Sequence, residues 1–159
     1  IVVDRVIAES FLAVVAPLLS DYDVEIFADQ KSYNILKRLN YSKLNQANPE
    51  DFGREFLDFK CSVKIVDDIY EALSHIAQFS SKHSEAILTE DATKAERFLN
   101  EVDAAVVYLN ASTRFTDGQV FGLGAEIGIS TQKLHARGPF ALEKLVTEKW
   151  VVKGSGQIR

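Results

Sequence analysis

Residues that could bind an anion gather in the stretch 110–138. Two arginines, Arg114 and Arg137, lie there with one histidine, five glycines and several hydroxyl side chains, Ser112 and Thr113 among them. A guanidinium group donates two parallel hydrogen bonds to a carboxylate or a phosphate, and hydroxyls and backbone amides beside glycines can complete the shell. The stretch therefore favours binding of an anionic ligand.

The two arginines also have a structural interpretation. Asp103, Asp117 and Glu126 lie close to them in the sequence and could form ion pairs with them. Surface ion pairs of this kind are common and contribute little to stability. The residue types leave both interpretations open.

Three glycines, Gly122, Gly124 and Gly128, raise the alternative of a dinucleotide-binding turn. That fingerprint requires its third glycine three positions after the second, where this sequence has Ile127, and an acidic residue about twenty positions further on. The spacing of the three glycines therefore departs from this fingerprint. We therefore expect the glycines to allow tight turns in a loop that packs against a sheet.

The histidines and the single cysteine offer weaker candidates. His135 has no second histidine or cysteine near it that would indicate zinc, and the positions of His75 and His83 match no metal motif. Cys61 falls in the middle of an expected strand, not in a loop or at a helix N-terminus where a thiolate is stabilised. A buried structural role is the preferred interpretation of Cys61.

The elements that must position the stretch 110–138 alternate between strand and helix. An apolar run at 104–109 predicts a buried strand directly before it, so the stretch should be an ordered loop at the carboxyl end of a strand. Other expected strands are 1–3, 24–28, 59–66, 85–89 and 149–153. The first expected helix has an apolar face at Ile7, Phe11, Val14, Val15 and Leu18 and is ended or bent by Pro17. Three more helices should begin at an N-cap at Asp29, a capping box at Asp68 and Glu71, and an N-cap at Asp91. A last helix should begin at Pro139 and bury Leu142, Leu145 and Val146.

This alternation predicts an α/β fold, an open and mostly parallel sheet with flanking helices. The segment 40–53 is polar, contains Pro49 and shows no period, so we expect a loop there. The 159 residues suffice for one domain with its own core.

The composition narrows the classes of function. The net charge of −5 gives no basic field for nucleic acid or an anionic membrane, and no apolar run approaches the length of a membrane span. A single cysteine indicates a reducing compartment such as the cytoplasm. Because the sequence has no methionine, we expect it to be part of a longer polypeptide.

Three motifs resemble gamma-glutamyl phosphate reductase, a family of the aldehyde dehydrogenase superfamily. The first is the run NASTRFTDG followed by FGLGAEIGISTQKLHARGP, which spans residues 110–139. The second consists of Val66, Ala72-Leu73, His75-Ile76, Phe79-Ser80, His83-Ser84-Glu85 and Ile87. The third is the closing Lys149-Trp150-Val151-Val152 with Gly156-Gln157-Ile158-Arg159. The similarity covers essentially the whole chain.

The resemblance implies an enzyme of proline biosynthesis that reduces gamma-glutamyl phosphate with NADPH to glutamate 5-semialdehyde and phosphate. In that family a cysteine thiolate attacks the acyl phosphate, and hydride from NADPH releases the aldehyde. The cysteine motif lies directly before the position of Ile1, and Cys61 does not align with it. The chain alone is therefore expected to be inactive.

The resemblance also assigns parts and residues. It implies most of an aldehyde-dehydrogenase-like catalytic domain in residues 1–147, a C-terminal strand arm for oligomerisation in 148–159, and no N-terminal cofactor domain. Glu55 resembles the glutamate that meets the nicotinamide ribose, although the usual Gly-Pro does not follow it. Asn110 opens the loop that faces the cysteine, and the choices for substrate binding are Asn110, Ser112, Thr113, Arg114 and Arg137.

The implied partners are the substrate, a further copy of the same subunit and, in a bifunctional protein, glutamate 5-kinase. A module with only a binding or assembly role, such as the reductase part of a bifunctional protein, is the alternative to a part of an enzyme. No metal is implied.

Overall fold

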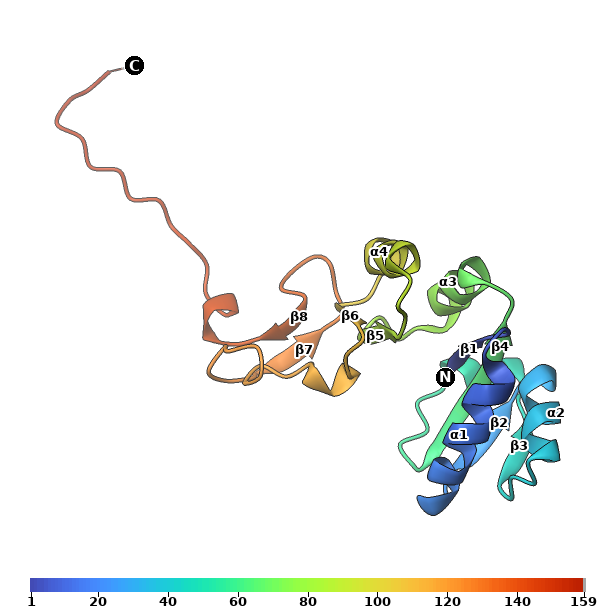
Figure 1. Cartoon of the computed structure of the whole chain (residues 1–159). Helices are drawn as coiled ribbons and strands as arrows, with labels where there is room; N and C mark the ends of the chain where they lie inside the picture. The colour runs from blue at the N-terminus through green and yellow to red at the C-terminus, as the bar shows by residue number, and fades with distance from the viewer. Residues whose placement is uncertain (159) are drawn as a thin grey trace.

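The first 66 positions contain the strands of a four-stranded parallel sheet in the computed structural model, which describes residues 1–158 (Figure 1). The strand order is β1-β4-β2-β3, and all three pairings are parallel. The strands are β1 (Val2–Asp4), β2 (Glu25–Ala28), β3 (Leu44–Gln46) and β4 (Lys60–Val66). This arrangement confirms the predicted α/β class with a mostly parallel sheet.

Helices α1 (Ala8–Asp21) and α2 (Gln30–Arg38) pack beside each other on this sheet. Leu12 of α1 and Leu36 of α2 meet Ile26 of β2 in the core, where each side chain is at most 1% exposed. Burial of such side chains is the main favourable term in folding. The core of the chain therefore lies between these two helices and the sheet.

The predicted apolar face of α1 is wrong by about one position. Ala8, Leu12 and Ala16 are buried, because small residues let the helix approach the sheet closely. Phe11 and Val15 only flank this core. The residues predicted to be buried but found more than half exposed are Ile7, Val14 and Leu18. Pro17 lies inside α1 and does not end the helix, which continues to Asp21.

The segment 40–53 contains regular structure that was not predicted. It holds β3, which pairs with β2, and a 3-10 helix, η1 (Pro49–Gly53). A capping box starts η1: Asn48 caps the turn, and the buried carboxylate of Asp51 accepts from the Asn48 N–H at 2.8 Å. A polar segment can form a strand here because an existing strand supplies the hydrogen bonds.

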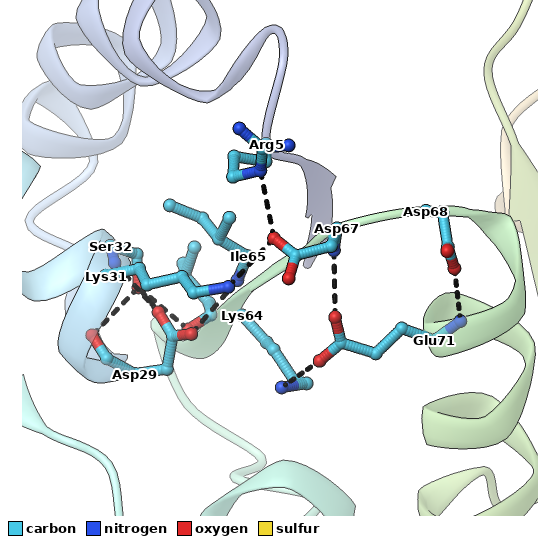
Figure 2. A network of polar contacts seen from close by, with 10 residues as sticks. Arg5, Asp29, Lys31, Ser32, Lys64, Ile65, Asp67, Asp68 and Glu71 are labelled. Carbon is cyan, nitrogen blue, oxygen red and sulfur yellow. Dashed lines mark hydrogen bonds and ion pairs between the residues drawn. The ribbon is translucent and has the colours of Figure 1, made fainter.

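Polar side chains tie together the carboxyl ends of β1, β2 and β4 (Figure 2). The Asp29 carboxylate accepts from the Ser32 N–H at 2.8 Å, as predicted for an N-cap, and from the Ile65 N–H of β4 at 3.3 Å. Asp67 accepts from Arg5 and from Lys31, each at 3.0 Å. Asp67 is thus paired with two cations, and Asp29 is bonded to two backbone amides, so both carboxylates have a structural role.

A second, two-stranded parallel sheet follows α3 (Ile69–Phe79). It pairs β5 (Ser84–Ile87) with β6 (Val106–Leu109), and α4 (Ala92–Glu101) connects them. The predicted N-caps of both helices are confirmed: Asp68 accepts from the Glu71 N–H at 2.9 Å, and Asp91 from the Thr93 and Lys94 N–H groups at 2.9 and 3.1 Å. The second half of the predicted capping box is wrong, because the Glu71 carboxylate accepts from the Asp67 N–H at 2.8 Å.

The last third differs from the prediction. Pro139 lies in a strand, β8 (Gly138–Phe140), which pairs antiparallel with β7 (Gly128–Ser130); the expected helix is wrong. Only a 3-10 turn, η3 (Leu142–Lys144), follows. The side chains expected to be buried in the helix are all more than half exposed: Leu142, Leu145 and Val146. Pairing with β7 supplies the hydrogen bonds that the backbone N–H and C=O groups of β8 would otherwise form in a helix.

The expected strand at 149–153 is also wrong for this chain. Residues 146–158 extend away from the rest of the molecule (Figure 1), and Trp150 is 92% exposed. A strand needs a partner, and none of the described residues pairs with this segment. Arg159, the last residue of the expected arm, lies outside the described residues. Within residues 1–158, no helix has the length and apolar character that a membrane crossing needs.

Candidate functional site

Asn110 joins the carboxyl ends of β5 and β6. Its amide oxygen accepts from the Thr89 N–H at 2.8 Å and its amide nitrogen donates to the Thr89 carbonyl at 2.9 Å. Its backbone has φ +51°, a left-handed conformation that asparagine adopts more readily than most residues. The stretch 110–138 therefore starts as predicted at the end of a strand, but main-chain contacts already engage the amide of Asn110.

Ser112, Thr113 and Arg114 form an exposed turn directly after Asn110. Ser112 is the N-cap of η2 (Thr113–Phe115), and its hydroxyl accepts from the Arg114 N–H at 3.2 Å. Within residues 1–158 Arg114 forms no ion pair. The turn thus offers one guanidinium and a neighbouring hydroxyl, that of Thr113, to an anion from solvent.

The carboxylates that could have neutralised Arg114 are used by the main chain. Asp117 accepts from the N–H groups of Gln119 and Val120 at 2.8 and 3.0 Å, and Glu126 accepts from the Gly118 N–H at 2.7 Å. A Cβ at Gly118 would lie 2.5 Å from the Ala125 carbonyl oxygen, so only glycine fits there. These hydrogen bonds connect the two ends of the segment 117–126, which therefore forms a closed loop.

The glycines of this segment do not form a dinucleotide-binding turn. Gly122 and Gly124 have φ of +75° and +72° in turns, and Gly128 starts β7, so no strand-to-helix junction is present there. This agrees with the interpretation that they permit tight turns.

A chain of polar side chains fixes η2 to the second sheet. The Thr116 hydroxyl lies 2.7 Å from the Ser84 hydroxyl and 2.8 Å from the Tyr108 hydroxyl, and His83 Nδ1 lies 2.8 Å from Ser84. Sequence patterns cannot indicate this contact, because Thr116 meets Ser84 across 32 positions. These bonds set the position of the turn that carries Arg114.

Arg137 lies against Asp103, at the amino side of β6. Its Nη1 is 2.9 Å from the Asp103 carboxylate, which also contacts Lys133 at 2.9 Å and Lys82 at 3.7 Å. The hydrogen bond from Lys133, followed by that from Arg137, lowers the pKa of Asp103 to about 2. The structure thus gives Arg137 one of the ion pairs that the sequence left open.

The Nε and Nη2 atoms of Arg137 are buried and have no hydrogen-bond partner within residues 1–158. These two donors form one complete fork of the guanidinium, the arrangement that binds a carboxylate or phosphate. Arg114 and Arg137 share no hydrogen-bond or ion-pair partner among the described residues. The two arginines are therefore separate candidates and not one clamp.

The remaining candidates lie apart from this region. Glu55 is exposed in the segment between η1 and β4. Cys61 lies within β4 opposite Ile26 as expected for a mid-strand residue, but it is partly and not fully buried. Burial raises the pKa of its thiol. His135 is exposed in the loop between β7 and β8.

A hollow of about 320 Å³ lies beside α3 and was not predicted. Phe52, His75 and Phe79 form an aromatic cluster there, and burial lowers the pKa of His75. An ion pair between Lys64 and Glu71, at 3.0 Å, also lines the hollow. In residues 1–158 no three histidine, cysteine, aspartate or glutamate side chains are grouped to hold a metal ion.

Comparisons with known proteins give one consistent result. No family model matches the chain. It is 55% identical over all 159 residues to the gamma-glutamyl phosphate reductase of Dehalococcoides mccartyi, and 59% identical over 143 residues, 89% of the chain, to that of Legionella pneumophila. The chain spans about 38% and 34% of the length of these two relatives.

The crystal structure of the Thermotoga maritima gamma-glutamyl phosphate reductase has the same fold. It matches 99% of the chain with a TM-score of 0.92 at 45% identity, and the chain covers 37% of that protein. The resemblance seen in the sequence motifs is thereby confirmed in both sequence and structure. Along its whole length, the chain is a homologue of one part of gamma-glutamyl phosphate reductase.

Proposed function

We propose that the chain forms part of an NADPH-dependent gamma-glutamyl phosphate reductase of proline biosynthesis, in the cytoplasm. The observation that carries this proposal is the 55% identity over all 159 residues to a protein of that name. In the proposed reaction the acyl phosphate gains a hydride and loses phosphate, which gives glutamate 5-semialdehyde. Glutamate 5-kinase, which makes acyl phosphates of this type, is the proposed source of the substrate.

The substrate carries a phosphate and an alpha-carboxylate, and the two arginines are the proposed donors to them. Arg114 is exposed beside the Ser112 and Thr113 hydroxyls and has no ion pair in the described residues, so it can take an anion without losing a bond. Arg137 has one unpartnered fork, although Asp103 holds its Nη1. These observations favour Arg114 as the first contact.

Asn110 has a positioning role in this proposal. Its amide is bonded on both sides to the Thr89 backbone, so it holds the loop that carries Ser112 and Arg114 and does not itself bind the anion. Loss of this amide would let the turn move relative to β5 and β6. Misplacement of a binding group by about 1 Å is sufficient to slow catalysis.

The residues present fit a nicotinamide cofactor in one respect. The Glu55 carboxylate is exposed, forms no ion pair in residues 1–158, and can accept hydrogen bonds from ribose hydroxyls. NADPH, when bound, supplies the hydride. The role of Glu55 is to orient the ribose.

The nucleophile is proposed to come from outside these 159 residues. Cys61 is the only cysteine, and burial raises the pKa of its thiol, which disfavours the reactive thiolate. We therefore expect no turnover from the chain alone. Association of subunits through the exposed segment 148–158 is part of the same proposal, because Trp150, Val151 and Val152 are all exposed and apolar.

The test joins the chain to the part of the Dehalococcoides mccartyi reductase that lies outside the matched residues. NADPH oxidation with phosphate release from gamma-glutamyl phosphate supports the proposal, and a matched Arg114→Lys variant reports whether a forked donor is needed. A folded chimera that binds NADPH but does not reduce the acyl phosphate would contradict the proposed activity.

A further inference from the structure

The turn η2, which carries Arg114, has no apolar anchor of its own. None of its three residues is buried, and its one large apolar side chain, that of Phe115, is 52% exposed. Apolar burial, the main favourable term in folding, therefore contributes little to holding this turn in place. Hydrogen bonds to the second sheet have to supply that hold.

Such bonds are present at both ends of the turn. Before it, the Asn110 amide is bonded to the Thr89 backbone. After it, Thr116 is the C-cap, and its N–H donates to the Thr113 carbonyl at 3.1 Å. Arg114 lies between these two anchors, only two positions before Thr116, so the position of its backbone depends on both of them.

The Thr116 hydroxyl contacts both strands of the second sheet. It lies 2.7 Å from the Ser84 hydroxyl of β5 and 2.8 Å from the Tyr108 hydroxyl of β6. The Ser84 hydroxyl in turn lies 2.8 Å from His83 Nδ1. All four side chains are partly buried, so they are shielded in part from competing water. All four also belong to this chain, so these contacts need no residue from elsewhere in a reductase.

The number of hydrogens in this network matches the number of contacts. Each of the three hydroxyls carries one hydrogen, and each of the three contacts needs one. A phenol is the strongest donor of the three hydroxyls, and the free nitrogen of a neutral imidazole is the strongest acceptor. The Tyr108 hydroxyl therefore donates to Thr116, and Thr116 donates to Ser84. The Ser84 hydroxyl donates to His83 Nδ1, so the imidazole carries its hydrogen on Nε2.

We propose that Thr116 is a second positioning residue of the anion site: its hydroxyl fixes η2 to β5 and β6 and thereby places the Arg114 guanidinium for the anionic group of the substrate. This inference rests on the proposed function of Arg114. Thr116 has no contact with the anion in this assignment, because its only hydrogen is donated to Ser84. Misplacement of a binding group by about 1 Å is sufficient to slow catalysis, so the hydroxyl acts on the reaction through Arg114.

The experiment uses the chimera with the Dehalococcoides mccartyi reductase. Thr116→Val keeps the shape of the side chain without its hydroxyl, and it should lower kcat/KM about tenfold, mainly through KM. Thr116→Ser keeps the hydroxyl and should stay within about twofold of the unsubstituted enzyme. Thr131→Val is the matched control and should have no effect, since Thr131 lies in the loop after β7 and its hydroxyl has no hydrogen bond within residues 1–158.

A double-mutant cycle with Arg114→Ala separates positioning from general stabilisation of the loop. If Thr116 acts through Arg114, Thr116→Val should change kcat/KM by less than about twofold once Arg114 is replaced. Equal losses in the two backgrounds would overturn the inference, because the hydroxyl would then act without the arginine. A loss with Thr131→Val as large as that with Thr116→Val would overturn it as well.

A second measurement, on the 159-residue chain, does not depend on activity. Thr116→Val should speed hydrogen exchange at the Arg114 and Phe115 amides at least about fivefold. It should leave the amide of Thr93, which Asp91 caps in α4, unchanged. Nitrogen NMR of the unsubstituted chain should show the hydrogen of neutral His83 on Nε2. A hydrogen on Nδ1 would overturn the assigned direction of the bonds, and unchanged exchange at the turn would overturn the inference as a whole.

The two measurements distinguish this inference from the proposed function. A folded chimera without reductase activity contradicts the proposed function, and the exchange rates then decide whether Thr116 holds the turn. Unchanged exchange contradicts the inference even if the chimera is active. Circular dichroism melts show whether each variant is folded. If Thr116→Val is not folded, Tyr108→Phe removes one of the two contacts of the Thr116 hydroxyl and should speed exchange at the same amides.

Discussion

Asp29 makes the clearest stability prediction, because one carboxylate serves a helix and a neighbouring strand. It caps α2 through the Ser32 N–H at 2.8 Å and accepts from the Ile65 N–H of β4 at 3.3 Å. Ser32 is fully buried and Ile65 is 2% exposed, so water cannot readily replace the lost acceptor. The Ser32 hydroxyl keeps the Val63 carbonyl as a partner at 3.1 Å.

We expect Asp29→Ala to lower the free energy of unfolding by about 2–4 kcal/mol. Loss of an N-cap costs about 1 kcal/mol, and a buried donor left without a partner costs about 1–3 kcal/mol. With a slope of about 2 kcal/mol per molar urea, the unfolding midpoint should fall by roughly 1–2 M. Asp29→Asn keeps one acceptor oxygen and should lose about half as much.

The assay is urea unfolding followed by far-ultraviolet circular dichroism, with Lys31→Ala as the control from the same helical turn. Lys31 forms an exposed ion pair with Asp67, so its removal should leave the midpoint nearly unchanged. The reasoning is refuted if Asp29→Ala and Lys31→Ala give the same midpoint, because the buried amides would then not depend on Asp29.

Four further outcomes are expected. In an intact reductase that carries this segment, Arg114→Ala should lower kcat/KM by roughly thirtyfold or more, the loss of about 2 kcal/mol from a charge-assisted bond, without a change in melting temperature; unchanged kinetics would remove it from the site. Arg137→Ala should lower both kcat/KM and the melting temperature, since its ion pair holds the loop; a loss of activity without a change in melting temperature would contradict the structural part of its role. In the same enzyme Cys61→Ser should leave turnover within a few-fold, and a loss beyond tenfold in a folded variant would contradict its assignment as structural. Deletion of residues 147–159 should shift the mass measured by light scattering toward that of the monomer. An unchanged mass would contradict the proposal that subunits associate through this segment.

The pH dependence of the loop depends on Asp103. Its pKa in the folded chain is about 2, below the ordinary value of 3.8, so its stabilising contribution is present above about pH 4 and is lost as the pH falls toward 2. A carboxyl-carbon NMR titration should give a midpoint near 2. A midpoint near 3.8 would show that Lys133 and Arg137 do not hold the carboxylate in solution.

Local signals in the sequence were sufficient for much of the helical structure. Asp29, Asp68 and Asp91 each precede a helix and each accepts from its first-turn amides, as predicted. A cap works over three or four residues, so the sequence contains both partners of the bond. The motifs in residues 110–139 likewise identified the family, because they depend on sequence alone.

Only the tertiary structure decided features that need a distant partner. Pro139 stands at a position typical of a helix start, but β8 forms because β7 supplies an antiparallel partner. The polar segment at 44–46 becomes β3 for the same reason, and 149–153 stays extended because the described residues offer it none. The sequence pattern of a strand cannot show which edge will be available.

The same reason limits what the sequence could say about the candidate site. Arg114 and Arg137 have equivalent surroundings in the sequence, yet Arg137 meets Asp103 across 34 positions while Asp117 and Glu126 bind backbone amides and leave Arg114 free to meet an anion. Residue types determine which bonds an arginine can form. The path of the folded chain determines which acceptors reach it, because an ion pair depends on distance in space and not on distance along the sequence.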